Sequence, residues 1–302
     1  MNAQNPNEQK HPIPQEAFDW YDEYAHGFIS RREFMERLST LTVVGFSVTA
    51  LTAALTPNYA LAEQVSFNDP DIKAEYLTFP SPEGHGEGRG YFVVPTSVTE
   101  PVGAVLVVHE NRGLNPYIKD VARRVAQAGF IALAPDALHP VGGYPGNDDR
   151  GRALQRSLDR AKIEQDMVAA AKFLKAQPLC NGRLGVVGFC FGGYITNMLA
   201  ATLPGDISAG VPFYGTPPAE GIRANIEAPL MIQLAELDER VNATWPEYEK
   251  ALKANNNSYT MHMYPGVHHG FHNDSTARYN EAAAELAWSR TIEFFKEHLA
   301  KG

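Results

Sequence analysis

The sequence predicts an α/β domain with a mostly parallel central sheet that is covered by helices on both faces. Three observations lead to this prediction. From residue 72 onward, short β-branched runs alternate with amphipathic stretches, and turn signals separate many of them. The inner runs, such as AVLVV and LGVVG, are apolar on consecutive residues. Strands that are buried on both faces have this pattern, which is typical of a parallel sheet between two layers of helices.

Eight β-branched or aromatic runs are predicted strands. They cover residues 74–79, 90–94, 104–109, 130–134, 184–188, 210–214, 230–235 and 260–264. Between them, apolar residues recur at helical spacing in two stretches, 163–174 and 288–299, and each stretch therefore has one stripe to lay on the sheet. Pro116 is placed where a first helical turn would begin. Asn181-Gly182 predicts a turn before the strand at 184–188.

Composition excludes several classes of protein. The 302 residues include 35 Asp+Glu and 26 Lys+Arg, for a net charge of −9, which argues against binding to nucleic acid or to an anionic membrane surface. The two cysteines, Cys180 and Cys190, bracket a predicted strand and are expected to lie too far apart for a disulfide. No spacing of Cys and His suggests a zinc site, so neither a metal nor another cofactor is expected.

Residues 1–62 differ from the rest of the chain and are interpreted as a separate leader. Arg31-Arg32 precedes the uncharged stretch 38–55, and Ala60-Leu61-Ala62 supplies small residues at its end. This layout predicts a secretory signal, and the paired arginines resemble a twin-arginine export signal. A membrane anchor fits less well, because six of the 18 uncharged residues are Ser or Thr.

A third interpretation keeps the N-terminal segment on the chain. Residues 18–38 would then form a cytosolic helical pair that is broken at Gly27. The predicted organisation is therefore a leader at 1–62 and an α/β domain at 63–302. Cleavage would give an exported, periplasmic protein, whereas a retained leader would give a cytoplasmic one.

The candidate nucleophile is Cys190. Gly188-Phe189-Cys190-Phe191-Gly192-Gly193 follows the predicted strand 184–188 and opens a helix, in the form G-x-nucleophile-x-G. A strand that turns directly into a helix needs glycines for close backbone approach, and it leaves its central residue strained. A helix N-terminus also favours a thiolate. The alternative is a structural Cys in a glycine-rich turn.

Two residues further along the chain complete a nucleophile, acid, histidine order, which is the order expected of an α/β-hydrolase fold. Asp238 follows strand 230–235, and His269 follows strand 260–264. Loops at the carboxyl ends of these strands can bring both to the Cys. From the residues alone, Glu236 could replace Asp238, and His268 could replace His269. A metal site formed by His262, His268, His269 and His272 is not favoured, because His262 lies within a predicted strand and the other spacings match no common helical ligand motif.

Four ordered segments resemble the dienelactone hydrolase family, the carboxymethylenebutenolidases, over about residues 72–300. The segments are 107–113 (VVHENRG), 188–193 (GFCFGG), 235–238 (AELD) and 264–271 (YPGVHHGF). The resemblance implies a triad of Cys190, His269 and Asp238. It selects His269 because the histidine of the family stands two residues before a Phe, here Phe271.

The resemblance also implies several supporting roles. Glu110 would hold the resting thiol and take its proton when substrate arrives. The backbone N–H groups of Phe191 and Asn111 would form the oxyanion hole.

For the substrate, the resemblance implies a carboxylate that arginines hold. Arg152 matches one of the arginines of the family, but the position of the second is Asn273 here. Arg278 could substitute for it, although a surface salt bridge is the expected role of Arg278. Tyr144 and Tyr214 could line the pocket, although core packing is the expected role of both.

Together these residues predict an enzyme that hydrolyses a small lactone or ester through a thioester on Cys190. The partner is a small-molecule substrate, with no nucleic acid and no stable membrane insertion after processing. A non-catalytic binding protein on the same scaffold is the alternative, because the second arginine is missing. A peptidase of the same architecture ranks lower.

Overall fold

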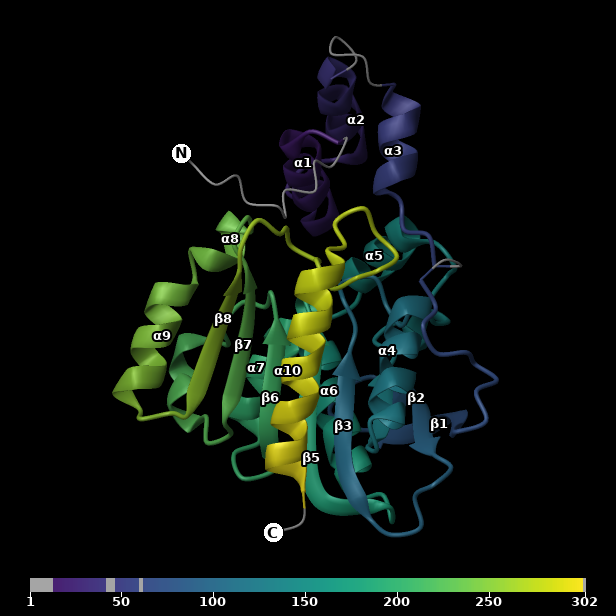
Figure 1. Ribbon diagram of the computed structural model, residues 1–302, viewed down its shortest axis with the longest axis vertical. Coiled ribbons are helices and arrows are strands. Elements are labelled where there is room, and N and C mark those ends of the chain that lie inside the picture. Colours follow the sequence, from purple (N-terminus) through teal and green to yellow (C-terminus); the bar gives the residue numbers. More distant parts are fainter. Residues whose placement is uncertain (1–12, 42–46, 60–61, 301–302) are drawn as a thin grey trace, which may run out of the picture.

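An eight-stranded sheet forms the centre of the protein (Figure 1). The computed structural model describes residues 13–41, 47–59 and 62–300. The strand order is β1-β2-β4-β3-β5-β6-β7-β8, and every pairing is parallel except β1 with β2 and β2 with β4. The strands are β1 (Ile72–Ser81), β2 (Gly86–Pro95), β3 (Val102–Val108), β4 (Ile131–Pro135), β5 (Cys180–Phe189), β6 (Ile207–Phe213), β7 (Leu230–Ala235) and β8 (Tyr259–Tyr264).

All eight predicted strands are confirmed, but β5 begins at Cys180 rather than at residue 184. Cys180 pairs with Val102 and Leu184 pairs with Ala104, so β5 carries extra residues at this point. Gly182, at φ +89°, lies in this irregularity. The Asn181-Gly182 signal therefore marks a bulge within the strand instead of a turn before it.

Helices cover both faces of the sheet, as predicted. On one face, α4 (Pro116–Gln127) and α10 (Glu281–Leu299) share a core with residues of the central strands such as Val105 and Val187. On the other face, α6 (Arg160–Lys175), α7 (Phe191–Thr202) and α9 (Trp245–Ala254) share a second core. The shorter helices are α5 (Asp148–Ser157), α8 (Glu239–Asn242), η2 (His139–Val141) and η3 (Glu220–Asn225).

Three further helices stand at one end of the sheet, beside α5 and α8 (Figure 1). They are α1 (Gln15–His26), α2 (Arg31–Thr40) and α3 (Val48–Leu55), which we call the N-terminal cap. Their buried side chains form a core of their own, which includes Phe34, Leu38 and Leu51. Gly27, at φ +74°, ends α1, and the Ser30 hydroxyl accepts a hydrogen bond from the Glu33 N–H to begin α2.

Helices α1 and α2 of the cap are separated at Gly27, as expected for the helical pair of a retained N-terminal segment. Arg31 and Arg32 lie in the first turn of α2. No helix in the described ranges combines the length and apolarity needed to cross a bilayer. Residues 42–46 of the uncharged stretch, and 60–61 at the predicted cleavage site, lie outside the described residues. Export and cleavage stay predictions.

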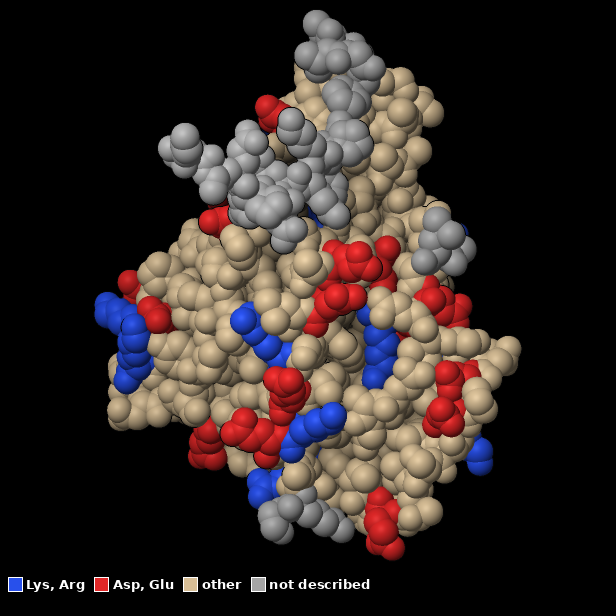
Figure 2. Space-filling model, viewed as in Figure 1, with Lys and Arg blue, Asp and Glu red and all other residues tan. Residues whose placement is uncertain are grey.

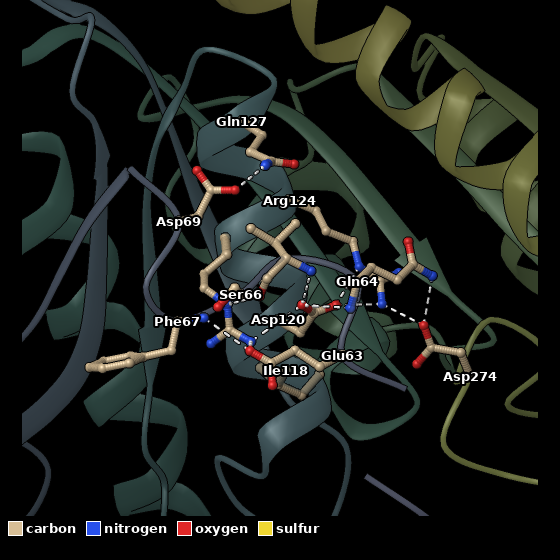
Figure 3. A network of polar contacts seen from close by, with 12 residues as sticks. Glu63, Gln64, Ser66, Phe67, Asp69, Ile118, Asp120, Arg124, Gln127 and Asp274 are labelled. Atoms are coloured by element: carbon tan, nitrogen blue, oxygen red, sulfur yellow. Dashed lines mark hydrogen bonds and ion pairs between the residues drawn. The ribbon is translucent and has the colours of Figure 1, made fainter. Parts of the chain in front are cut away.

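The segment that follows the cap is anchored on α4. The Asp120 carboxylate accepts hydrogen bonds from the Gln64 and Val65 N–H groups at 3.2 and 2.8 Å (Figure 3). Arg124 bonds both Asp120 and Asp274, and the Gln64 amide donates to Asp274 at 2.7 Å. The network therefore joins the start of the α/β domain to the loop before α10.

The face of the protein shown in Figure 2 carries charges of both signs. Among the described residues of this face, acidic and basic side chains are interspersed, and no continuous basic area is visible. An acidic chain with mixed surface charge is expected to look like this.

Candidate active site

Cys190 occupies the turn between β5 and α7 in a strained conformation. Its backbone has φ +57° and ψ −109°, which is rare for any residue with a side chain. The neighbouring glycines allow this turn because other backbone atoms occupy the space of a side chain. A Cβ on Gly188 would lie 2.0 Å from the Gly192 carbonyl oxygen, and one on Gly192 would lie 2.1 Å from the Val108 oxygen. The strained turn that the glycines predict is thus observed.

His269 and Asp238 form a hydrogen-bonded pair. The His269 Nδ1 lies 2.5 Å from the Asp238 Oδ2, and both side chains are buried. The other carboxylate oxygen of Asp238 accepts a hydrogen bond from the Val241 N–H at 3.2 Å, which fixes its orientation. A histidine held in this way at Nδ1 directs Nε2 away from the acid, which is the orientation required of a general base.

The alternative acid and histidines that the sequence offered have other hydrogen-bond partners. The Glu236 carboxylate accepts a hydrogen bond from the Gly266 N–H at 2.7 Å. His268 lies against α1, with its Nδ1 3.2 Å from the Gln15 amide nitrogen. The His272 Nδ1 is 2.6 Å from the Tyr117 hydroxyl, and burial lowers the pKa of His272 well below its usual value. The geometry therefore pairs His269 with Asp238.

Glu110 follows β3 and is buried. Burial raises the pKa of its carboxyl group, nearby Arg112 lowers it, and the charge of Cys190 raises it. The Asn273 amide donates a hydrogen bond to the Glu110 Oε2 at 3.0 Å. Glu110 is thus a buried acid whose pKa depends on the charge of the Cys190 sulfur and on the neighbouring arginines.

Asn273 occupies the position of the second substrate arginine, and Arg278 was considered as its substitute; both side chains are buried. Asn273 is fully buried against Glu110. The expectation of a surface salt bridge for Arg278 is wrong, because only 4% of this residue is exposed. Its guanidinium lies 5.1 Å from the ring centre of Tyr21, so α1 covers it.

Arg152 lines a cavity of about 380 Å³ together with Cys190 and Phe191, which we call the Cys190 cavity. Its guanidinium lies 3.9 Å from the centre of the Tyr24 ring and donates a hydrogen bond to the Tyr24 carbonyl oxygen. The side-chain amide of Asn111 similarly donates to the Ala25 carbonyl oxygen at 2.8 Å. Two residues that the family resemblance places in the site are therefore attached to α1.

Tyr214 lines the Cys190 cavity although it is almost fully buried. Its backbone φ is +38°, and its ring centre is 4.8 Å from that of His269. Tyr144 lies elsewhere, with its hydroxyl bonded to Asp148 at 2.7 Å. Of the two tyrosines considered, only Tyr214 therefore lines this cavity.

Sequence reasoning missed the contribution of α1 to the site. Phe18, Tyr21 and Ala25 are spaced along one helical face, and all are buried. This aromatic stripe was the available signal, but the interpretation of 1–62 as a leader left it unused. Sequence reasoning named Arg152 but missed the other arginines of the Cys190 cavity, which are Arg156, Arg160 and Arg240. Within the described ranges, no Asp or Glu lines this cavity.

Family models match two parts of the chain. The model of the dienelactone hydrolase family matches residues 89–299. A model described as YqhI-like matches residues 5–43, which include α1 and α2. The second match lies outside the first, so α1 and α2 of the N-terminal cap match a different model from the α/β domain.

Individual relatives agree with the larger match. The Escherichia coli K12 protein named "Putative hydrolase fragment YghX" is 68% identical over 110 residues, 36% of this chain and 94% of its own length. A Bradyrhizobium protein named "Probable 2-oxo-3-(5-oxofuran-2-ylidene)propanoate lactonase" is 31% identical, over 71% of this chain and 92% of that protein. A Klebsiella pneumoniae crystal structure described as a "Putative Dienelactone Hydrolase" superposes with a TM-score of 0.66 at 27% identity, over 75% of this chain and 99% of that one.

Proposed function

Since the chain belongs to the dienelactone hydrolase family, and is therefore a hydrolase of small lactones or esters, we propose that Cys190, His269 and Asp238 form its catalytic triad. One observation carries this proposal. The strained Cys190 stands at the N-terminus of α7, and the hydrogen-bonded His269–Asp238 pair follows β8 and β7 at the same edge of the sheet. The carboxyl ends of parallel strands meet at one edge, where ligands of such folds collect.

The reaction proceeds in two halves. The Cys190 sulfur attacks the carbonyl carbon, and the resulting oxyanion accepts hydrogen bonds from the N–H groups of Phe191 and Asn111. When the C–O bond of the ester breaks, a protonated His269 donates its Nε2 proton to the leaving oxygen, and a thioester remains on Cys190. Water then attacks the thioester as the neutral His269 takes one of its protons, which returns His269 to its protonated form. The carboxylic acid is released, and the departing thiolate of Cys190 recovers the proton that Glu110 took before the attack.

Glu110 acts before the attack. An ordinary thiol has a pKa of ~8.5 and is mostly protonated at neutral pH, so it needs a base. Burial raises the pKa of Glu110 and makes its carboxylate a stronger base than an exposed one. We assign Glu110 as the group that takes the proton of Cys190. Arg112 and Arg278 limit the rise of its pKa.

Substitution of Cys190 in the full chain tests the proposal. Cys190→Ala is expected to lower kcat/KM at least about 10³-fold on a panel of esters and lactones, since loss of a nucleophile removes the covalent route. Cys180→Ala is the matched control, because Cys180 is partly exposed and lies at the end of β5 that is far from Cys190. It should retain full activity.

Trapping of the intermediate provides the second measurement. Acid-quenched enzyme should carry an acyl mass on the peptide that contains Cys190. Activity that survives in Cys190→Ala would refute the triad. A wild-type protein that binds esters without turnover would instead identify a binding protein on this scaffold.

The sequence predicts export through the paired arginines, with a retained N-terminal segment as the alternative. For the working enzyme we propose the retained segment, and the contacts of α1 with Asn111 and Arg152 support it. N-terminal sequencing of the protein from fractionated cells distinguishes the two, since an intact N-terminus in the cytosol excludes export.

A further inference from the structure

A second cavity lies on the His269 side of the candidate site. It has a volume of about 720 Å³, and both His269 and Asp238 line it. We call it the α1 cavity, because α1 and Phe28, two residues beyond the end of α1, supply one wall. That wall includes Gln15, Phe18 and Phe28. None of these three belongs to the part of the chain that matches the dienelactone hydrolase family.

The wall from α1 is fixed against the loop that carries His269. The ring centres of Phe18 and His268 are 4.6 Å apart, and the Gln15 amide lies 3.2 Å from the His268 Nδ1. On the opposite side, Leu237 and Arg240 come from the loop after β7 and from α8. The α1 cavity thus exists only while the N-terminal cap is in place.

The two cavities adjoin. Arg240 lines both the Cys190 cavity and the α1 cavity, and its guanidinium lies 6.0 Å from the ring centre of Phe28. One substrate can therefore reach from one cavity into the other. The scissile bond would then lie between the sulfur of Cys190 and the imidazole of His269.

The chemistry of the triad determines which part of the substrate goes where. The histidine must reach the leaving oxygen to donate its proton, so the leaving alcohol lies on the histidine side. We propose that the α1 cavity is the subsite for the leaving alcohol, and that the preferred substrate is an ester with a bulky, uncharged alcohol. This inference rests on the proposed function. In a small lactone, the alcohol stays tethered to the acyl group and would leave a cavity of this size unused.

The charges of the two cavities support the same assignment. Among the described residues, no Asp or Glu lines the Cys190 cavity, whereas acidic residues outnumber arginines around the α1 cavity. The acidic residues of the α1 cavity are Asp19, Glu23, Glu236, Asp238 and Glu239, and its arginines are Arg240 and Arg278. Like charges repel in a partly desolvated cavity, so this acidic excess disfavours an anionic leaving group there.

A cavity-filling pair of variants tests the inference. Leu237→Trp narrows the α1 cavity, and Thr216→Trp narrows the Cys190 cavity as the matched control. Methyl, benzyl and naphthylmethyl esters of one acid vary only the alcohol. For Leu237→Trp, we expect kcat/KM to fall at least tenfold more on the naphthylmethyl ester than on the methyl ester, because steric misfit in a pocket discriminates by this order.

A second series of substrates varies the acid instead of the alcohol. On methyl esters of acids of increasing size, the kcat/KM of Thr216→Trp should fall below that of wild type as the acid grows. The kcat/KM of Leu237→Trp should stay within about twofold of wild type across this series. Phe28→Ala should widen tolerance for large alcohols, whereas Phe67→Ala, which removes an equally exposed Phe outside both cavities, should not.

The outcomes separate this inference from the proposed function. If Cys190→Ala is inactive but Leu237→Trp discriminates by acid size, or does not discriminate at all, the subsite assignment is overturned and the triad stands. If Cys190→Ala is active, the triad itself fails. A small lactone that is hydrolysed with a kcat/KM above that of every ester would also overturn the preference for a bulky alcohol.

Discussion

The turn that carries Cys190 and the helix that covers the site are held in opposite ways. Around Cys190, backbone packs against backbone, and a single added carbon on Gly188 or Gly192 would overlap a carbonyl oxygen. Helix α1 is held by side chains, through the Arg152 and Asn111 hydrogen bonds and the contact of Phe18 with His268. Backbone contact admits one geometry, whereas side-chain contact can be adjusted. Chemistry should therefore depend on the turn, and substrate selection on α1.

The strongest test of the rigid region is Gly192→Ala. The added Cβ would lie 2.1 Å from the Val108 carbonyl oxygen, so the turn must shift and carry Cys190 with it. We expect a loss of stability of about 1–3 kcal/mol, as in overpacked cores, together with a loss of activity of at least about 100-fold. Thermal unfolding and ester hydrolysis measure the two effects.

Gly221→Ala is the matched control for this variant. No atom lies within 4 Å of a Cβ at that position, and its backbone is not in the positive-φ region. The control should keep full activity and unfold at or slightly above the temperature of the wild type. A fully active Gly192→Ala would show that the turn is less constrained than its packing indicates.

Glu110→Gln should separate activity from stability. The pKa of Glu110 is raised by burial, so the folded protein binds a proton here more readily than the unfolded chain does. The contribution of this group to stability is therefore complete at low pH and is lost as the pH rises through the raised pKa. Glutamine carries no charge to bury. Relative to wild type, Glu110→Gln should gain stability as the pH rises above the usual range of a carboxyl group.

The same substitution should reduce catalysis. Without a base for Cys190, we expect kcat/KM to fall about 10²- to 10⁴-fold at neutral pH and to recover in part as the thiol ionises at alkaline pH. Glu87→Gln, at an exposed position of β2, is the control for both readouts. A flat pH profile for Glu110→Gln that matches the profile of the wild type would remove Glu110 from the mechanism.

The smallest expected effect concerns the adjustable region. Phe18→Ala removes the ring that lies 4.6 Å from His268, while the hydrogen bonds of Arg152 and Asn111 to α1 remain. The aromatic contact itself contributes about 0.5–1.5 kcal/mol, and the loss of a buried ring also loosens the core of the cap. We therefore expect at least a three- to tenfold loss in kcat/KM for large esters. Faster amide exchange in α1 should accompany it.

Glu16→Ala, on the exposed side of the same helix, provides the comparison and should change neither quantity. If Phe18→Ala and Glu16→Ala behave alike, α1 does not take part in substrate selection. In that case the Cys190 turn would still be constrained by its packing, but α1 would cover the site without affecting which substrate binds.

The sequence predicts most of the α/β domain because its signals are local. Consecutive apolar residues identify the buried strands, and Pro116 predicts the first turn of α4. The glycines around Cys190 predict the strained turn. The start of β5 was missed, because a bulge at Gly182 has the same local composition as a turn.

The remaining features depend on contacts between distant parts of the chain. No local pattern reveals that Asn273 bonds Glu110, or that Tyr24 lies under Arg152. The surroundings of Arg278 were predicted wrongly for the same reason, since its burial depends on Tyr21, far away in the sequence. Interpretation of the first 62 residues as a removable leader excluded these partners from consideration.

The network around Asp120 has a consequence for the N-terminal cap. Gln64 and Val65 are fixed on α4, and the Asn58 N–H donates to the Ser275 carbonyl oxygen at 2.6 Å, so the chain is secured just beyond α3. If the N-terminal cap moves away as one unit to admit substrate, the short segment between α3 and this secured point keeps it close by. Its local concentration stays high, in the millimolar range for short tethers. Reclosure is then an intramolecular event, and its rate should not change on dilution of the enzyme.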